Sequence, residues 1–231
     1  MRKIALIAFL SLLLSLPMFA GFFPKVVHTS IKSVEGDSFT LKKKLPIVGM
    51  SAVVVHDYGN DLHAITAHVV QNANNASVSL VSRDILHHDE LPTIKTAIIP
   101  GDKIIAGYMY SNVLLFAPDA DTYAKITSSY NKKWIHPDLF ALYLANVGDT
   151  RPTKENLFHF SKKYQVGLIC IVRNNNVVLM DPISGKVIAS KGMKNLPKKG
   201  RYPFYMRFEK IEAGWFSQDV IDDYYTIMNT L

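Results

Sequence analysis

The chain has 231 residues, of which 48% are hydrophobic and 19% charged, and its formal net charge is +7 at pH 7. This hydrophobic fraction is typical of a folded chain and excludes a mostly disordered one. Removal of the first 20 residues, which carry two basic side chains, would lower the charge from +7 to +5. A mildly basic surface without a dense stripe of lysine and arginine indicates that nucleic acid is not a partner.

The first 20 residues are predicted to be a signal peptide. A basic start is followed by an apolar run over residues 4–16, a proline and the small residue Ala20 at the cleavage position. The apolar run is short for a membrane span, which needs about 20 residues. We therefore expect an exported protein that begins near Gly21. The alternative is a retained anchor, which is the only route to membrane contact that we expect.

Residues 21–117 are predicted to form a β-rich, barrel-like domain. Short runs rich in β-branched residues alternate with turn signals such as Glu35-Gly36-Asp37 and Gly101-Asp102. Six or seven short strands at this spacing are typical of a small barrel or sandwich. The expected strands are 26–33, 38–42, 51–56, 63–70, 77–82, 103–110 and 113–116.

Residues 118–231 are predicted to form an α/β domain, which makes the fold class of the whole chain α+β. Helices are expected to be capped by Asp119 and Thr153, and another is expected to begin at Pro137. We expect these helices to pack on a small, mostly antiparallel sheet. The expected strands are 166–173, 177–181, 186–190 and 203–208, and a closing helix is expected over 215–228.

The sequence contains no catalytic signature. The run Gly49-Met50-Ser51-Ala52-Val53 lacks the final glycine of a nucleophile elbow, and no glycine-rich phosphate loop occurs. Neighbouring side chains of His87-His88-Asp89-Glu90 would point to opposite faces of a strand, as would His63 and His68, so no metal site is expected. The single cysteine, Cys170, is expected to be a buried hydrophobe. We predict a protein without a cofactor or enzymatic activity; a hydrolase would need His and carboxylates in one cleft.

Two clusters of basic residues are the candidate binding site. One follows an early strand and the other precedes the last expected strand: Lys42, Lys43 and Lys44, and Lys198, Lys199 and Arg201. In the structural interpretation, these side chains form a solvated surface that keeps the edges of strands from pairing with other chains. Their functional interpretation is attraction of an acidic partner, such as anionic lipid, polysaccharide or an acidic protein face.

Six short stretches, spread from the late β-rich half to near the C-terminus, carry a family resemblance. The most specific is Trp134-Ile135-His136-Pro137-Asp138-Leu139-Phe140-Ala141. The others are Gly101-Asp102-Lys103-Ile104, Leu114-Leu115-Phe116-Ala117-Pro118, Pro152-Thr153-Lys154-Glu155, Pro203-Phe204-Tyr205 and Gly214-Trp215-Phe216. Together they make the chain similar to the N-terminal domain of bacterial plasminogen-binding proteins.

This resemblance implies a protein of the periplasm or cell surface of a Gram-negative bacterium that binds host plasminogen through lysines. It further implies that kringle modules of plasminogen engage a C-terminal lysine or a cation beside a carboxylate. A second likeness covers residues 153–190, which are similar to envelope assembly proteins of the curli-secretion and flagellar-ring kind. That likeness implies an alternative function, a structural subunit of a periplasmic envelope or flagellar accessory complex. In both cases the expected partner is a protein, either plasminogen or other subunits of an envelope complex.

Overall fold

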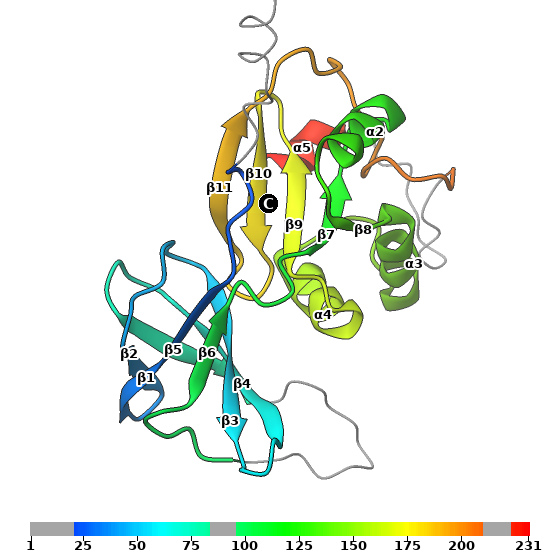
Figure 1. Cartoon of the computed structure of the whole chain (residues 1–231). Helices are drawn as coiled ribbons and strands as arrows, with labels where there is room; N and C mark the ends of the chain where they lie inside the picture. Colours follow the sequence, from blue (N-terminus) through cyan, green and yellow to red (C-terminus); the bar gives the residue numbers. More distant parts are fainter. Residues whose placement is uncertain (1–20, 84–95, 210–222) are drawn as a thin grey trace, which may run out of the picture.

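The computed structural model shows two β-sheets, with helices packed around the second one (Figure 1). It describes residues 21–83, 96–209 and 223–231. The predicted signal peptide, the histidine run at 87–90, the 214–216 stretch and most of the closing helix lie outside these residues. None of the helices in the described ranges is long and apolar enough to cross a membrane. The mixed α and β composition expected from the sequence is confirmed.

The first sheet is a closed ring of six antiparallel strands. Their order around the ring is β1-β2-β5-β4-β3-β6, and β6 pairs again with β1. The strands are β1 (Val27–Glu35), β2 (Ser38–Leu41), β3 (Ser51–Asp57), β4 (His63–Val70), β5 (Ser77–Ser82) and β6 (Lys103–Ala106). Closure gives each strand a partner on both sides, so the sheet has no free edge.

Apolar side chains from alternate strand positions fill the interior of this ring. Phe39 and Leu41 on β2, Ile31 on β1, Val54 on β3 and Ile104 on β6 are each at most 2% exposed. The alternation arises because successive side chains of a strand point to opposite faces, and one face of each strand must enter the core.

The second sheet has five strands in the order β11-β10-β9-β7-β8. The strands are β7 (Asn112–Phe116), β8 (Lys133–Ile135), β9 (Leu168–Val172), β10 (Asn176–Asp181) and β11 (Lys186–Gly192). Two pairings, β7 with β8 and β7 with β9, are parallel, whereas β9 with β10 and β10 with β11 are antiparallel. The sheet is therefore mixed, with as many parallel as antiparallel pairings, where a mostly antiparallel sheet was expected. Parallel neighbours need long crossovers, and here helices provide them.

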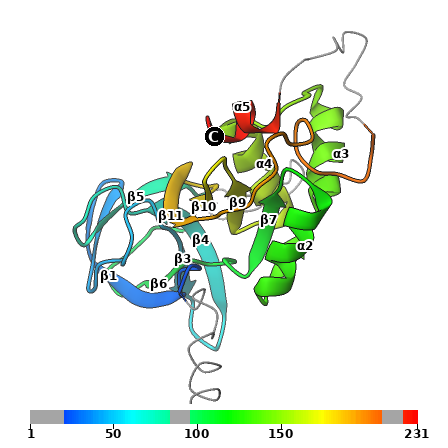
Figure 2. The ribbon, with the colours of Figure 1, turned by 90° about the horizontal axis from the view of Figure 1, so that it is seen from above.

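Four helices lie in the described part of the chain. They are α2 (Ala120–Ser129), α3 (Pro137–Val147), α4 (Lys154–Tyr164) and α5 (Tyr224–Met228). The carboxylate of Asp119 accepts a hydrogen bond from the backbone N of Thr122 at 2.7 Å, which caps α2 as predicted. Thr153 caps α4 in the same way, through the backbone N of Asn156 at 3.1 Å. Figure 2 shows α2 and α3 on the side of the second sheet away from the ring.

Three further details of the second half differ from the sequence prediction. The strand at 113–116 was expected in the β-rich half but pairs in the second sheet as β7, where residues 113–116 are all completely buried. Strand β8 was not predicted, because its three residues are too few to show an alternation of polar and apolar side chains. Residues 203–208 form an irregular segment rather than a strand. Two of its apolar side chains, Phe204 and Met206, instead fill the core from a loop.

Candidate binding surface

A buried carboxylate joins the ring to the second sheet. Asp181 ends β10 and is fully buried, and its Oδ2 accepts hydrogen bonds from the backbone N of Ser51 at 2.9 Å and the hydroxyl of Tyr110 at 2.6 Å. Its Oδ1 accepts from the backbone N of Ile183 and Ser184. Burial, followed by the charge of Asp181, raises the pKa of Tyr110, so this hydroxyl remains a donor. The carboxylate therefore links the first residue of β3 to the end of β10.

The beginning of the described chain packs on the second sheet before it enters the ring. Phe22 is 9% exposed, and the Phe23 ring lies 4.9 Å from the Tyr130 ring and 6.2 Å from the Trp134 ring, measured between centroids. The Nζ of Lys132 lies 4.6 Å from the centroid of Phe23, which is within range of a cation–π contact. This aromatic anchor fixes the chain directly after the predicted cleavage position.

The first predicted basic cluster, Lys42–Lys44, lies on an exposed loop after β2. The Nζ of Lys44 donates to the Oδ1 of Asn74 at 3.2 Å. The loop backbone is fixed at Leu45, whose N and O both pair with the side-chain amide of the buried Gln71, at 2.8 and 3.1 Å. The cluster is therefore an exposed set of cations on a well-held backbone.

The second predicted basic cluster lies on the loop after β11. Lys198 and Lys199 are exposed, and neither side chain has a partner among the described residues. Arg201 is half-buried and its guanidinium donates to the carbonyl O of Phe208, so it serves the fold of the loop. Lys198 shares a small surface hollow with the carboxylate of Asp223.

Hydrogen bonds hold the loop backbone directly before Lys198 and directly after Lys199. The backbone N of Gly200 donates to the Oδ1 of Asp223 at 2.9 Å, and the hydroxyl of Tyr225 donates to the carbonyl O of Pro197 at 2.9 Å. A Cβ on Gly200 would lie 2.6 Å from the Cβ of Tyr224, so the backbone approaches α5 very closely. The loop lies at the end of the second sheet away from the ring (Figure 1), so the two basic clusters are not brought together.

One exposed pair of opposite charges was not found from the sequence. The Nζ of Lys103 lies 3.7 Å from the Oδ2 of Asp57, and the two side chains are 59% and 49% exposed. The pKa of Asp57 is lowered, first by the hydrogen bond from the backbone N of Gly59 and then by His63 and Lys103, so it is ionised at neutral pH. The two residues are distant in sequence and meet through the pairing of β3 with β6, which no local pattern reveals.

Three of the stretches that carry the family resemblance contribute to the core around the second sheet. Phe116, Phe140 and Phe204 come from three of these stretches, and each is completely buried. Their ring centroids lie 4.7 to 5.9 Å apart. Aromatic pairs at these distances contribute stability beyond the burial of their area. These matching residues are therefore part of the fold and do not form a binding surface.

The start of α3 fixes the irregular 202–208 segment. The Nδ1 of His136 accepts a hydrogen bond from the backbone N of Asp138 at 3.2 Å, and burial lowers the pKa of His136, which agrees with an accepting nitrogen. The carboxylate of Asp138 accepts from the backbone N of Arg207 at 2.9 Å and from its Nε. Burial alone would raise the pKa of Asp138, but these hydrogen bonds together lower it.

A His–Asp pair lies in the wall of the ring. The Nδ1 of His56 is 2.8 Å from the Oδ1 of Asp102, and the Oδ2 of Asp102 accepts from the backbone N of Ile99 at 3.0 Å. Asp102 is 5% exposed, and the pair connects β3 to the turn before β6.

Within the described ranges no three His, Cys, Asp or Glu side chains are grouped so that they could hold a metal ion. Cys170 is fully buried, and burial raises the pKa of its thiol.

A known protein family matches the chain. The family model described as plasminogen-binding protein pgbA N-terminal matches residues 26–231, which is nearly the whole chain. Among the curated proteins and the solved structures, none matches. The chain therefore belongs to the plasminogen-binding protein pgbA N-terminal family.

Proposed function

We propose that this protein is exported to the cell envelope and binds plasminogen through exposed lysines. The observation that carries the proposal is the family match over residues 26–231, whose description names plasminogen binding. The exposure of both predicted lysine clusters supports it, because an interaction of this kind requires ammonium groups that a partner can reach. Three of the matching residues, Phe116, Phe140 and Phe204, are completely buried, so the contact residues are sought on the surface.

Among the lysines of the two predicted clusters, Lys198 is the one that we place at the contact. Its side chain is exposed, and Lys198 lines a small hollow together with Asp223, so a basic and an acidic residue share one surface feature, which is the kind of site that the family resemblance implies for kringle modules. The neighbouring Lys199 adds a second positive charge on the same loop. Because this loop is held by Gly200 and Pro197, little conformational entropy would be lost when a partner binds.

Lys42–Lys44 form a separate second contact in this proposal. They lie on the ring, whereas Lys198 lies beside α5, so one multi-module partner would have to span both surfaces. Two weak contacts to one partner reinforce each other when the geometry allows both at once.

Export rests on residues 1–20, and the structure supplies one supporting observation. Phe22 and Phe23 pack on the second sheet, so cleavage after Ala20 would leave the aromatic anchor intact. N-terminal sequencing of the protein from the cell envelope checks this. We expect the mature chain to begin at Gly21. A chain that still begins at Met1 would mean that residues 1–20 are retained.

Charge-removing variants test the contact. The double variant Lys198→Gln and Lys199→Gln, made in residues 21–231, is expected to weaken plasminogen binding roughly tenfold in a biosensor assay, because a few contacts carry most of the binding free energy of an interface. The matched control is Lys25→Gln with Lys32→Gln, since both side chains are exposed and the net charge changes by the same amount. Equal weakening by the two double variants would mean that only overall charge matters.

A further inference from the structure

A pocket lies between α2 and the second sheet, and we call it the α2 pocket. Its volume is about 270 Å³. The C-terminal half of α2 forms one wall, and β10, the end of β11 and the loop at 193–195 form the other. Phe22, near the start of the described chain, lines it as well. The pocket therefore brings together four segments that are far apart in the sequence.

Apolar side chains form much of the lining of the α2 pocket. Phe22, Ile126 and Val177 come from three separate parts of the chain and are 9%, 5% and 5% exposed. Met193 adds a half-buried thioether side chain, which adapts easily to the shape of a ligand. Binding sites for small molecules are typically concave and mostly apolar, with a few polar groups that fix the orientation of the ligand. The lining is thus suited to the apolar part of a small molecule.

Two lysines bring positive charge to the α2 pocket. Lys125 comes from α2 and Lys194 from the loop after β11, and both are exposed. Neither ammonium group has a hydrogen bond, an ion pair or an aromatic ring as a partner among the described residues. Asp119 and Asp121 line an adjoining hollow that shares Lys125, but neither forms an ion pair with it. The stem of a lysine can cover apolar surface while its ammonium group stays at the opening.

The loop that carries Lys194 has a fixed backbone. The backbone N of Met193 donates to the carbonyl O of Asn175 at 2.9 Å. Asn195 has a φ of 60°, in the left-handed region that Asn tolerates better than most residues, so the chain turns directly after Lys194. Little conformational entropy of the loop would therefore be lost when a ligand binds.

The end of α2 is arranged so that it opposes an anion less than a bare helix end would. The last carbonyl groups of a helix carry a partial negative charge. Here the Oγ atoms of Ser128 and Ser129 donate to the carbonyl O of Lys125, at 3.1 and 2.6 Å. Because these hydroxyl groups offset part of that charge, the two ammonium groups make the pocket attractive to an anionic group.

We propose that the α2 pocket binds a medium-chain fatty acid. Its carboxylate would pair with the ammonium groups of Lys125 and Lys194. Its chain would lie against Phe22, Ile126 and Val177. The two lysines belong to neither predicted basic cluster, so the inference is independent of plasminogen binding.

The size of the ligand follows from the volume of the pocket. An engineered cavity of about 150 Å³ accommodates benzene, so 270 Å³ corresponds to roughly ten non-hydrogen atoms. Octanoate is of this size. A membrane phospholipid presents a similar anionic group, but its two acyl chains are several times larger than the pocket. The volume therefore favours a free, single-chain molecule.

The test measures binding of octanoate to residues 21–231 by isothermal titration calorimetry at pH 7.5. A Kd on the order of 1 mM is expected. The uncharged analogue octanamide should bind at least about fivefold more weakly, because it cannot pair with the ammonium groups. Hexanoate should bind roughly tenfold more weakly, because each buried methylene contributes up to about fourfold in affinity.

A double variant tests the two lysines directly. Lys125→Gln with Lys194→Gln should weaken octanoate binding roughly tenfold and leave the binding of octanamide unchanged. A general disturbance of the pocket would weaken both. The matched control is Lys25→Gln with Lys32→Gln, since both residues are exposed, lie outside the pocket and remove the same charge.

Several results would overturn the proposal. These are equal affinities for octanoate and octanamide, equal affinities for octanoate and hexanoate, and equal weakening of octanoate binding by the two double variants. Vesicles of anionic phospholipid provide a further comparison. Binding to such vesicles without binding of free octanoate would mean that the lysines contact a membrane surface, and would also overturn the proposal.

Discussion

The hydroxyl of Tyr110 donates a 2.6 Å hydrogen bond to the fully buried carboxylate of Asp181. Tyr110 lies in the connection between β6 and β7, and Asp181 ends β10, so this bond joins the linker between the two sheets to the second sheet. The backbone N of Ser51 donates to the same carboxylate oxygen, which adds the ring to the junction. One charged group therefore holds three parts of the chain, and we expect the two sheets to unfold together.

Removal of the Tyr110 hydroxyl should destabilise this junction. Tyr110→Phe is expected to lower the free energy of unfolding by about 1.5–3 kcal/mol, because a hydrogen bond to a buried charged group is lost. Urea denaturation measures the change. The control is Tyr58→Phe, since the Tyr58 side chain is 42% exposed and its hydroxyl pairs only with Thr96 at the surface. Similar losses of stability in the two variants would show that the hydrogen bond from Tyr110 to the buried carboxylate contributes no more than a hydrogen bond at the surface.

A glycine at the crossing of two backbone segments should be essential. Gly167→Ala is expected to lower the free energy of unfolding by roughly 3 kcal/mol or more, because its Cβ would lie 2.1 Å from the carbonyl O of Met109. In contrast, a Cβ on Gly192 meets nothing within 4 Å. Gly192→Ala should change stability by at most about 0.5 kcal/mol. Thermal unfolding of both variants provides the comparison, and equal midpoints would contradict the close approach.

The stability of the protein should fall in mild acid because of His68. Burial lowers the pKa of His68 in the folded state to about 4, below the ordinary value of about 6.5, so the unfolded chain binds the proton more readily. The contribution to stability is complete above about pH 6.5 and is lost as the pH falls toward 4, by roughly 2–3 kcal/mol. His68→Gln should remove this part of the pH dependence. His28→Gln, a change at an exposed histidine, should retain it.

The aromatic anchor at Phe22 and Phe23 should contribute to stability. Phe22→Ala is expected to lower the free energy of unfolding by about 2–4 kcal/mol, because a large buried side chain is lost. The control is Val26→Ala, whose side chain is 49% exposed. A chain that begins at residue 25 should show a similar loss. Unchanged stability of that shortened chain would mean that the anchor is not part of the folded unit.

Local signals in the sequence predict most of the elements. The strands at 63–70 and 77–82 have the predicted bounds, and the caps at Asp119 and Thr153 form as expected. These features depend on residues that are close in the chain, such as turn residues and capping side chains. They can therefore be derived without knowledge of the tertiary structure.

Pairing between distant strands could not be predicted in the same way. The strand at 113–116 is apolar throughout and fits either sheet, and only its contacts with β8 and β9 assign it to the second one. The expected strand at 203–208 is a loop because Phe204 packs against Phe116 while the segment is fixed by Asp138. Both outcomes depend on partners that are far away in sequence.

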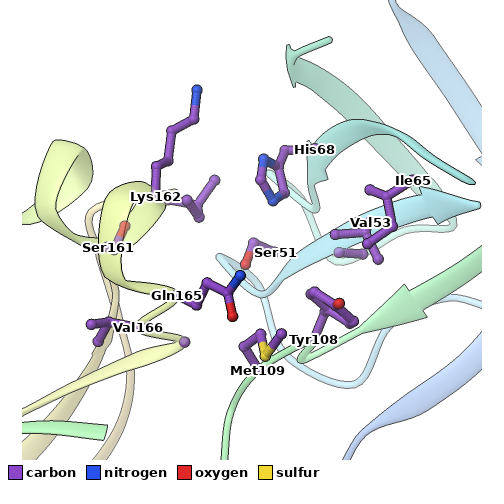
Figure 3. A pocket seen from close by; sticks show the side chains of 13 residues that line it. Ser51, Val53, Ile65, His68, Tyr108, Met109, Ser161, Lys162, Gln165 and Val166 are labelled. Atoms are coloured by element: carbon purple, nitrogen blue, oxygen red, sulfur yellow. The ribbon is translucent and has the colours of Figure 1, made fainter. Parts of the chain in front are cut away.

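A pocket between strands β3 and β4 and the end of α4 (Figure 3) also depends on a feature that the sequence does not reveal. Val55 pairs with Ile65 and Val54 pairs with Ala67, so Thr66 is an extra residue in β4. This bulge reverses the alternation of side chains along the strand, and as a result Ile65 and His68 line the same pocket. The expectation that residues an odd number apart point to opposite faces does not hold across this bulge.

The most direct test of the proposed function is competition by a free lysine analogue. Plasminogen binding to immobilised residues 21–231 is measured in a biosensor, with and without saturating 6-aminohexanoic acid. We predict saturable binding that the analogue abolishes, because the contact uses exposed lysines such as Lys198. Absence of binding, or binding that the analogue does not reduce, would contradict the proposal.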